Sequence, residues 1–310
     1  MIILLALILS TLSYGYDSYQ FSGEFNDSII YHYQNMLLIR EVDQLQIETQ
    51  PRIPQTSYIS DMSARDCILV LKPKSHFVIK KINQGVQVKC YDKAESAEQF
   101  NILLDAGHGG KDPGAISKEG LKEKDVALGF VVQLNKLLTK RFEGRVHLTR
   151  NSDMHLDKYQ RLKKVLELKP DLMISIHADA FFTPNAAGFG AIHLNEGQGS
   201  KKSQQIMEAF NAQPSESMRE QSKSFAQDIL NDLNGNYRLH NTRPTSEALV
   251  ILRSPWSRSI LLELGFLSNP DEAKKLADSE YIMKLASDLA QSIERYILKN
   301  EGIIKIGYVD

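Results

Sequence analysis

The pattern of apolar and polar positions divides the chain near residue 98. Beyond that point, short apolar runs alternate with segments in which apolar residues recur at helical spacing. Strands that alternate with helices build a mostly parallel sheet. We therefore predict an α/β fold, a six-stranded mostly parallel sheet with helices on both faces. The predicted strands are 100–105, 145–149, 172–176, 188–194, 248–252 and 259–264, and the predicted helices are 123–140, 156–168, 222–234 and 279–298.

The residues before this boundary carry a different pattern. Between Asp66 and Asp92 the run DCILVLKPKSHFVIKKINQGVQVKCYD alternates apolar and polar residues in three short segments, which Pro/Lys and Gln-Gly turns separate. Residues 16–60 are polar and weakly patterned. We expect a small β-rich domain over 16–98, the α/β domain over 99–301 and a short tail over 302–310.

The first fifteen residues, 1–15, predict a signal peptide. An apolar block from Met1 to Leu9 precedes Ser10 to Gly15, which offers a small-residue cleavage site. The block is too short to span a bilayer comfortably. It lacks a positive charge near Met1, so retention as an N-terminal anchor stays an alternative to cleavage. We expect no integral membrane segment after the signal.

Composition and charge narrow the function classes. The chain has 310 residues, of which 42% are hydrophobic and 24% charged, and its formal net charge is −1. These values are typical of a globular protein with room for two domains. Because the lysines are dispersed and form no basic patch, we expect no nucleic-acid partner.

The two cysteines leave two alternatives open. Cys67 and Cys90 lie 23 positions apart, and neither belongs to a CxxC pair, which argues against a metal site. In an oxidising compartment they would form one disulfide, worth about 3 kcal/mol by loop entropy. The other reading is a pair of buried free thiols.

Two histidines and an acid stand where the elements predict an open site. His108 lies in the Gly-rich turn of ILLDAGHGGKDPGA, just after a strand, and His177 ends the strand in ISIHADA. Glu123 lies where the first helix begins; an acid there also complements the helix dipole. Two histidines and one glutamate, with a fourth position left for water, are a common catalytic zinc set.

A second glutamate ends a later strand. Glu263 follows the apolar run of SILLELGFLSN, and a carboxylate in such a run is costly without a partner or a role. His108, His177 and Glu263 all lie at or just past strand ends. In α/β sheets ligands bind outside the carboxyl ends of the strands, so these residues should converge at one edge. The alternative for Glu263 is a structural pairing with Arg253 or Arg258.

Five ordered motifs over residues 100–298 resemble one family. The motifs are DAGHGGKDPGA, GLKEKDVAL, TRNSD with LDKYQRL, SIHADA and LLELGFLSN, and they are similar to those of the zinc-dependent N-acetylmuramoyl-L-alanine amidases. The resemblance implies that His108, Glu123 and His177 bind one Zn²⁺ per chain, and that Glu263 is the catalytic acid/base. Where many relatives have Asn, SIHADA has Asp179, which puts the role of that position in question.

The resemblance implies a cell-wall hydrolase. It would cut the amide between N-acetylmuramic acid and L-alanine of peptidoglycan through a zinc-activated water, for cell-wall remodelling or daughter-cell separation. It would act in the periplasm or cell envelope as a monomer, with an activator protein as one further partner. Residues 16–98 are only faintly similar to the family's wall-targeting module. Two alternatives remain, a zinc peptidase acting within the stem peptide and a non-catalytic wall-binding protein.

Four acids have secondary assignments. Asp105, three residues before His108, is expected to orient the ligand loop, and Asp179 to act beside the site or on substrate. Residues 195–220 form a polar insertion with a helical centre. In some relatives a longer insertion carries a helix that plugs the zinc site. Glu196 and Glu208 are therefore the candidates for a lid, against a passive surface loop as the alternative.

Overall fold

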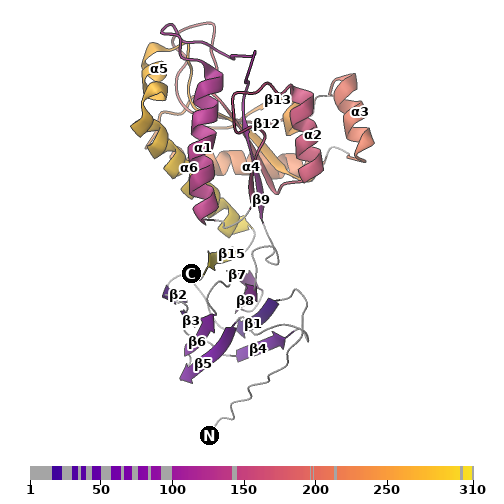
Figure 1. Cartoon of the computed structure of the whole chain (residues 1–310), viewed down its shortest axis with the longest axis vertical. Helices are drawn as coiled ribbons and strands as arrows, with labels where there is room; N and C mark the ends of the chain where they lie inside the picture. The colour runs from indigo at the N-terminus through magenta and orange to yellow at the C-terminus, as the bar shows by residue number, and fades with distance from the viewer. Residues whose placement is uncertain are drawn as a thin grey trace. The chain divides into compact units, whose positions relative to one another are not determined.

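The computed structural model divides the chain into two compact units, and each is described by itself (Figure 1). The first holds 1–99, 141–144 and 297–310, and the second holds 100–140 and 145–296. The boundary after Gln99 lies next to the one predicted from sequence. The structure describes residues 16–22, 30–33, 36–39, 44–49, 57–63, 66–71, 76–82, 85–91, 100–141, 145–195, 197, 199–212, 215–300 and 303–308.

The first unit contains two antiparallel sheets. One has the strand order β15-β7-β8-β1-β4 and the other the order β2-β3-β6-β5. The strands are β1 (Tyr16–Ser22), β2 (Ile30–Tyr33), β3 (Met36–Ile39), β4 (Gln44–Thr49), β5 (Ser57–Ser63), β6 (Asp66–Leu71), β7 (His76–Ile82), β8 (Gly85–Tyr91) and β15 (Ile303–Tyr308). A β-rich unit therefore precedes the α/β fold, as the alternating pattern predicts.

The C-terminal residues and the two cysteines of this unit were the subject of predictions. Residues 303–308, predicted as part of a tail, form β15, which pairs antiparallel with β7. The alternation in IIKIGY is too short to separate an edge strand from a tail by sequence. Cys67 lies in β6 and Cys90 in β8, which belong to different sheets. Their side chains, and the predicted signal at 1–15, lie outside the described residues.

The second unit is built on one six-stranded sheet of order β10-β9-β11-β14-β12-β13. Strands β10, β9, β11 and β14 run parallel, β12 is antiparallel to β14, and β13 is parallel to β12. The strands are β9 (Asn101–Ala106), β10 (Arg145–Leu148), β11 (Leu172–His177), β12 (Gly190–Leu194), β13 (Thr245–Glu247) and β14 (Arg258–Glu263). The predicted α/β class and the mostly parallel sheet are confirmed.

Helices cover both faces of this sheet. Figure 1 shows α1 and α6 on one side and α2 with α3 on the other, and α4 packs on β12 and β14. The helices are α1 (Glu123–Arg141), α2 (Lys158–Leu168), α3 (Lys201–Ala209), α4 (Glu216–Leu233), α5 (Pro270–Ala277) and α6 (Ser279–Asn300). Among the described helices, none combines the length and apolar character needed to cross a bilayer.

The predicted strand over 248–252 is wrong. Residues Val250–Leu252 form the 3₁₀ helix η3, and the sixth strand, β13, lies just before it. The apolar run is short, and its periodicity does not distinguish a strand from a helical turn. In the fold, Ile251 and Leu252 pack against the sheet on the face that α2 covers.

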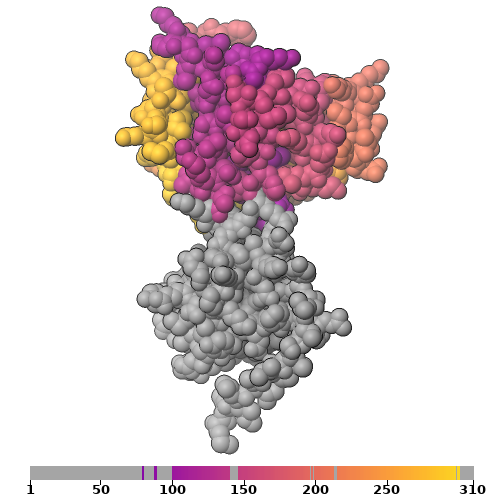
Figure 2. All heavy atoms as spheres, viewed as in Figure 1, coloured from indigo at the N-terminus to yellow at the C-terminus, as the bar shows by residue number. Residues whose placement is uncertain are grey.

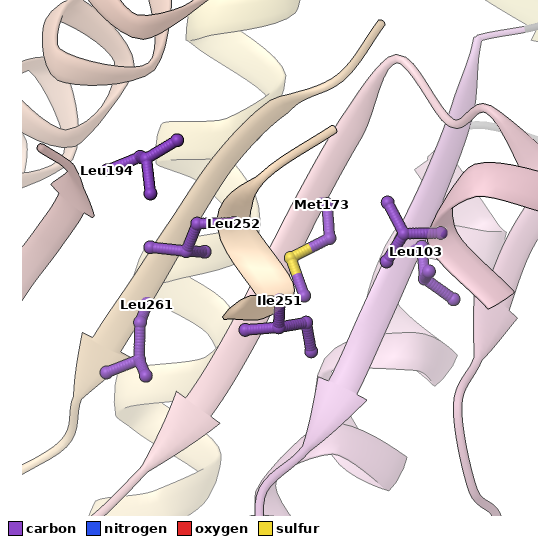
Figure 3. Close-up of a cluster of buried hydrophobic side chains, with 7 residues drawn as sticks. Leu103, Met173, Leu194, Ile251, Leu252 and Leu261 are labelled. Carbon is purple, nitrogen blue, oxygen red and sulfur yellow. The ribbon is translucent and has the colours of Figure 1, made fainter. Parts of the chain in front are cut away.

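Strand alternation places the core and the candidate site on the same face. Leu103, Met173 and Leu261 belong to one buried cluster with Ile251 and Leu252 (Figure 3). Since side chains two residues apart share a face, the later residues of the same three strands point to this side as well. These later residues are Asp105, Ser175, His177 and Glu263. Packing of the apolar positions thus fixes where the polar strand ends lie.

Candidate metal centre and active site

The turn after β9 brings His108 against the end of β11. His108 adopts a left-handed backbone conformation, with φ of 57°. Gly107 before it lies so close to the His177 ring that a Cβ there would approach ring atoms to 2.5–2.8 Å. At Gly114 a Cβ would lie 2.5 Å from a Glu123 oxygen and 2.7 Å from the His108 ring. The glycines of this turn therefore allow the three candidate ligands to meet.

Two buried arginines hold the same turn by its carbonyl groups. Arg150 donates from Nε to the Ala106 carbonyl, at 2.9 Å, and from Nη2 to the Gly107 carbonyl, at 2.7 Å. Arg161, from α2, donates from Nη2 to the His108 carbonyl, at 2.5 Å. Hydrogen bonds from a charged donor are among the stronger ones in proteins. The two arginines thus fix the backbone of the turn at three consecutive carbonyl groups, the last of which is that of His108.

Glu123 lies between the two histidines at the start of α1. Its Oε2 is 3.1 Å from His108 Nε2 and its Oε1 is 2.8 Å from His177 Nδ1. The backbone N–H groups of Ala115 and Ala178 also donate to this carboxylate. Burial alone would raise the pKa of Glu123, but the hydrogen bonds to His108 and His177 outweigh it and hold the pKa well below its ordinary value.

These three side chains form a group that fits a metal ion. One ligand atom from each of His108, Glu123 and His177 lies within 4.8 Å of the others. A tetrahedral zinc with bonds of about 2.0–2.1 Å separates its ligands by roughly 3.4 Å, so donors up to 4.8 Å apart would move closer together around the ion. The donor set, two imidazoles and one carboxylate, is one of those that catalytic zinc uses. The residues predicted from sequence as ligands are thus together in the fold.

Asp112 orients His108, a contact that the sequence analysis missed. Its Oδ2 lies 2.9 Å from His108 Nδ1, which leaves Nε2 directed at Glu123. A carboxylate on the second ring nitrogen is a usual support for a metal-ligating histidine. Asp112 lies within the quoted motif DAGHGGKDPGA, four residues after the histidine. The sequence pattern alone pointed to Asp105, and only as a residue that orients the ligand loop.

Asp105, expected from sequence to orient the ligand loop, is buried. It accepts hydrogen bonds from Thr149 at 2.5 Å and Ser175 at 2.7 Å, and it pairs with Arg161. Burial alone would raise the pKa of Asp105, but Arg161 and the two hydroxyl groups outweigh it, and the pKa is lowered. Since Arg161 also holds the His108 carbonyl, Asp105 reaches the ligand turn through that arginine.

Glu263 is buried beside the metal-binding group. It is the register partner of His177 in the next parallel strand, and its Oε2 accepts from the Asp179 N–H at 3.0 Å. Burial, followed by the charges of Glu123 and Asp179, raises the pKa of Glu263 well above its ordinary value. The Asp179 side chain is exposed, and its Oδ1 accepts from the next backbone N–H, that of Ala180. Asp179 therefore orients Glu263 through its backbone.

Of the two lid candidates, Glu196 and Glu208, the structure describes only Glu208. Glu208 is exposed on α3, and this helix packs against α2 through buried Met207. In the space-filling view the surface of α3 adjoins that of α2 (Figure 2). Glu196 lies outside the described residues. Within the described part of the chain, the residues grouped for a metal are His108, Glu123 and His177.

Comparison with known families agrees with this geometry. The sequence model described as N-acetylmuramoyl-L-alanine amidase matches residues 102–295. An N-acetylmuramoyl-L-alanine amidase AmiC of Neisseria meningitidis is 32% identical over 228 residues, which are 66% of this chain and 54% of the relative. An AmiC of Escherichia coli is 29% identical over 239 residues, 69% of this chain and 57% of the relative. The chain thus spans little more than half the length of these two relatives.

Solved structures resemble the second unit. The N-acetylmuramoyl-L-alanine amidase of Clostridium difficile has a TM-score of 0.55 and 24% identity, over 66% of this chain and all of its own. The CwlD amidase of Clostridioides difficile, solved in complex with the GerS lipoprotein, has a TM-score of 0.52 and 26% identity, over 65% of this chain and 100% of its own. The first likeness supports the fold alone.

Proposed function

The chain belongs to the N-acetylmuramoyl-L-alanine amidase family, and we propose that it hydrolyses the amide between N-acetylmuramic acid and L-alanine in peptidoglycan. The observation that supports this most is the convergence of His108, Glu123 and His177 beside buried Glu263. A donor set with an adjoining proton carrier suits hydrolysis of an unactivated amide.

We infer that one zinc ion per chain is held by His108, Glu123 and His177. When bound, zinc supplies a Lewis acid toward water and toward the scissile carbonyl. Asp112 keeps His108 Nε2 directed at the ion, and Arg150 and Arg161 hold the backbone of the turn. Deprotonated Glu123 matches the carboxylate form that a metal ligand needs.

Glu263 acts in this proposal as the general base and then the general acid. It takes a proton from the attacking water while the new C–O bond forms, and it delivers that proton to the amide nitrogen as the C–N bond breaks. The products are the lactyl carboxylate of the sugar and the free amine of L-alanine. A raised pKa suits a group that must hold a proton between these two transfers. The Asp179 N–H keeps the carboxyl group oriented.

Analysis of digested peptidoglycan tests this function. Purified sacculi treated with the full chain should release peptides with a free amino terminus on L-alanine, together with glycan that keeps an unsubstituted lactyl group. New amino termini on other residues of the stem peptide would instead identify a peptidase that uses the same metal and glutamate. If neither kind of product forms although zinc is bound, the chain is a non-catalytic wall-binding protein.

The cellular setting is part of the same proposal. An enzyme with this substrate acts outside the cytoplasm, so we propose an exported protein of the periplasm or cell envelope that serves cell-wall remodelling or daughter-cell separation. One related amidase was solved with a lipoprotein partner. An activator protein is accordingly a reasonable partner to seek for this chain.

A further inference from the structure

A place beside Glu263 is left open by a glycine. Gly190 of β12 is the register partner of Glu263 in the antiparallel pair β12/β14, so both positions face the same side of the sheet. A Cβ at Gly190 would lie 3.6 Å from Glu263 Cβ and 3.9 Å from His240 Cβ. Because Gly190 has no side chain, a gap with room for one small side chain remains between Glu263 and His240, and we call this gap the slot.

Aromatic rings continue from this slot. The ring of His240 lies 4.6 Å from that of Phe266, and Phe181 lies 6.4 Å from Phe266 and 6.5 Å from His240. Phe182 follows at 6.0 Å from Phe181. Phe266 is buried, while Phe181 is half-exposed and Phe182 is fully exposed. We call these four rings the aromatic wall.

The exposure of the wall is fixed by the backbone around it. The Phe181 N–H donates to Ser268 Oγ at 3.0 Å, and the Leu267 N–H donates to the Asp179 carbonyl at 2.7 Å. His240 is held through its own N–H, which donates to the Phe189 carbonyl at 2.8 Å. Large apolar side chains that are exposed to solvent next to a reaction centre are typical of a binding surface.

The aromatic wall and the turn that carries His108 differ in the side chains that they present. The wall consists of rings without a permanent charge, while the carboxylates of Asp179 and Glu247 also act on Glu263. The turn that carries His108 continues through a segment with exposed Lys111, Lys118 and Lys122. In the substrate, the sugar next to the scissile amide is neutral, whereas the stem peptide carries carboxylates. The neutral sugar therefore matches the uncharged rings of the wall.

We propose that the slot over Gly190 and the aromatic wall form the subsite for the pyranose ring attached to the scissile amide. A pyranose presents C–H groups on its flat face, and these contact the electron-rich face of an aromatic ring favourably. The inference rests on the proposed amidase function.

Two matched substrates distinguish binding of the sugar from cleavage of the amide. The first is N-acetylmuramoyl-L-alanyl-D-isoglutamine, and the second is the same dipeptide carrying only a lactoyl group in place of the sugar. Both contain the same scissile amide. The zinc-loaded full chain should cleave both, with a higher kcat/KM for the first, and the ratio of the two values measures what the sugar contributes.

Three substitutions should lower that ratio. Phe182→Ala and His240→Ala remove ring faces, and we expect each to reduce the preference by about tenfold, mainly through KM for the sugar-bearing substrate. Gly190→Val fills the slot, and the strand accommodates it because its Cβ makes only ordinary contacts. Phe182→Tyr should retain the preference. Ile116→Ala, which removes an exposed apolar side chain from the lysine-bearing segment, is the matched control.

The outcomes distinguish this proposal from the function on which it rests. If neither substrate yields free L-alanyl peptide, the amidase function fails. If both are cleaved equally by the unmodified chain, or if the variants slow both substrates by the same factor, the amidase stands and the sugar subsite is wrong. A loss confined to KM for the lactoyl peptide would assign the aromatic wall to the peptide side and overturn the proposal.

Discussion

His177 and Glu263 are register partners at the ends of two adjacent parallel strands, β11 and β14. Partners in a parallel pair point to the same face, so a candidate metal ligand and the candidate acid/base lie side by side without any loop between them. The pairing depends on Met173, Leu261 and their neighbours, which bury the earlier part of the same face. The relative position of His177 and Glu263 is therefore set by the core of the sheet.

The first prediction concerns metal content. The full chain should bind one zinc ion, and His108→Ala or His177→Ala should remove it, since each deletes one of three ligands. Metal analysis of the purified variants measures this, with circular dichroism to confirm the fold. His193→Ala, on β12, is the matched control and should keep its zinc. A chelated, metal-free protein with full activity would contradict the prediction.

The second prediction separates metal binding from proton transfer. Glu263→Gln should retain zinc but lose turnover by on the order of 10²–10⁴-fold, because an amide cannot accept the proton. Release of L-alanyl peptides from sacculi gives the rate. Glu167→Gln, an exposed acid on α2, is the control. Near-normal turnover of Glu263→Gln with metal in place would reassign Glu263 to a structural role.

Sequence reasoning predicted the parts of this site that depend on strand periodicity. The ends of β9, β11 and β14, and the residues they carry, follow from apolar runs that stop at a turn. No local pattern predicts the contact of Asp112 with His108, because only the geometry of the turn brings this acid to the ring. The carbonyl contacts of Arg150 and Arg161 join segments more than 40 residues apart, and no local pattern encodes them.

The third prediction follows from the contact that sequence reasoning missed. Asp112→Ala should weaken zinc binding by about 10–100-fold, because His108 loses the group that directs its Nε2 to the metal. Competition with a chelator of known affinity measures the effect. Asp112→Asn should be intermediate, since its amide oxygen can still accept from Nδ1–H. Glu119→Ala, an exposed acid in the same segment, should leave the affinity unchanged. Equal affinities for all four proteins would remove Asp112 from the site.

The fourth prediction concerns stability and pH. The pKa of Asp105 is lowered in the folded state, so its contribution to stability is complete above the ordinary value of 3.8 and is lost as the pH falls through the lower folded value. Asp105→Ala should cost about 3–5 kcal/mol near neutral pH, since Arg161 is left buried without its partner. Trp256 is the single tryptophan, and its fluorescence during urea unfolding reports on the second unit.

The difference between Asp105→Ala and the unmodified chain should shrink as the pH falls from about 4 through the lowered folded pKa of Asp105, because the unfolded state then binds a proton that the folded state does not. Glu167→Gln removes an exposed carboxylate that pairs with Lys163 at 3.6 Å, and it should change stability by less than about 1 kcal/mol at every pH. A pH-independent difference for Asp105→Ala would show that packing, and not charge, accounts for its effect.

The last prediction addresses the insertion that carries Glu196 and Glu208. If one of these carboxylates competes for the open position of the metal, replacing it by Gln should raise the basal rate on purified sacculi, since the site is then open for a larger fraction of the time. Zinc content should not change. Substitution is preferable to deletion, because Met207 of α3 is buried against α2 and its removal would expose core. Glu216→Gln, at the start of α4, is the matched control. Unchanged rates for both Glu196→Gln and Glu208→Gln would make the insertion a passive surface element, and any activator would then have to act elsewhere on the chain.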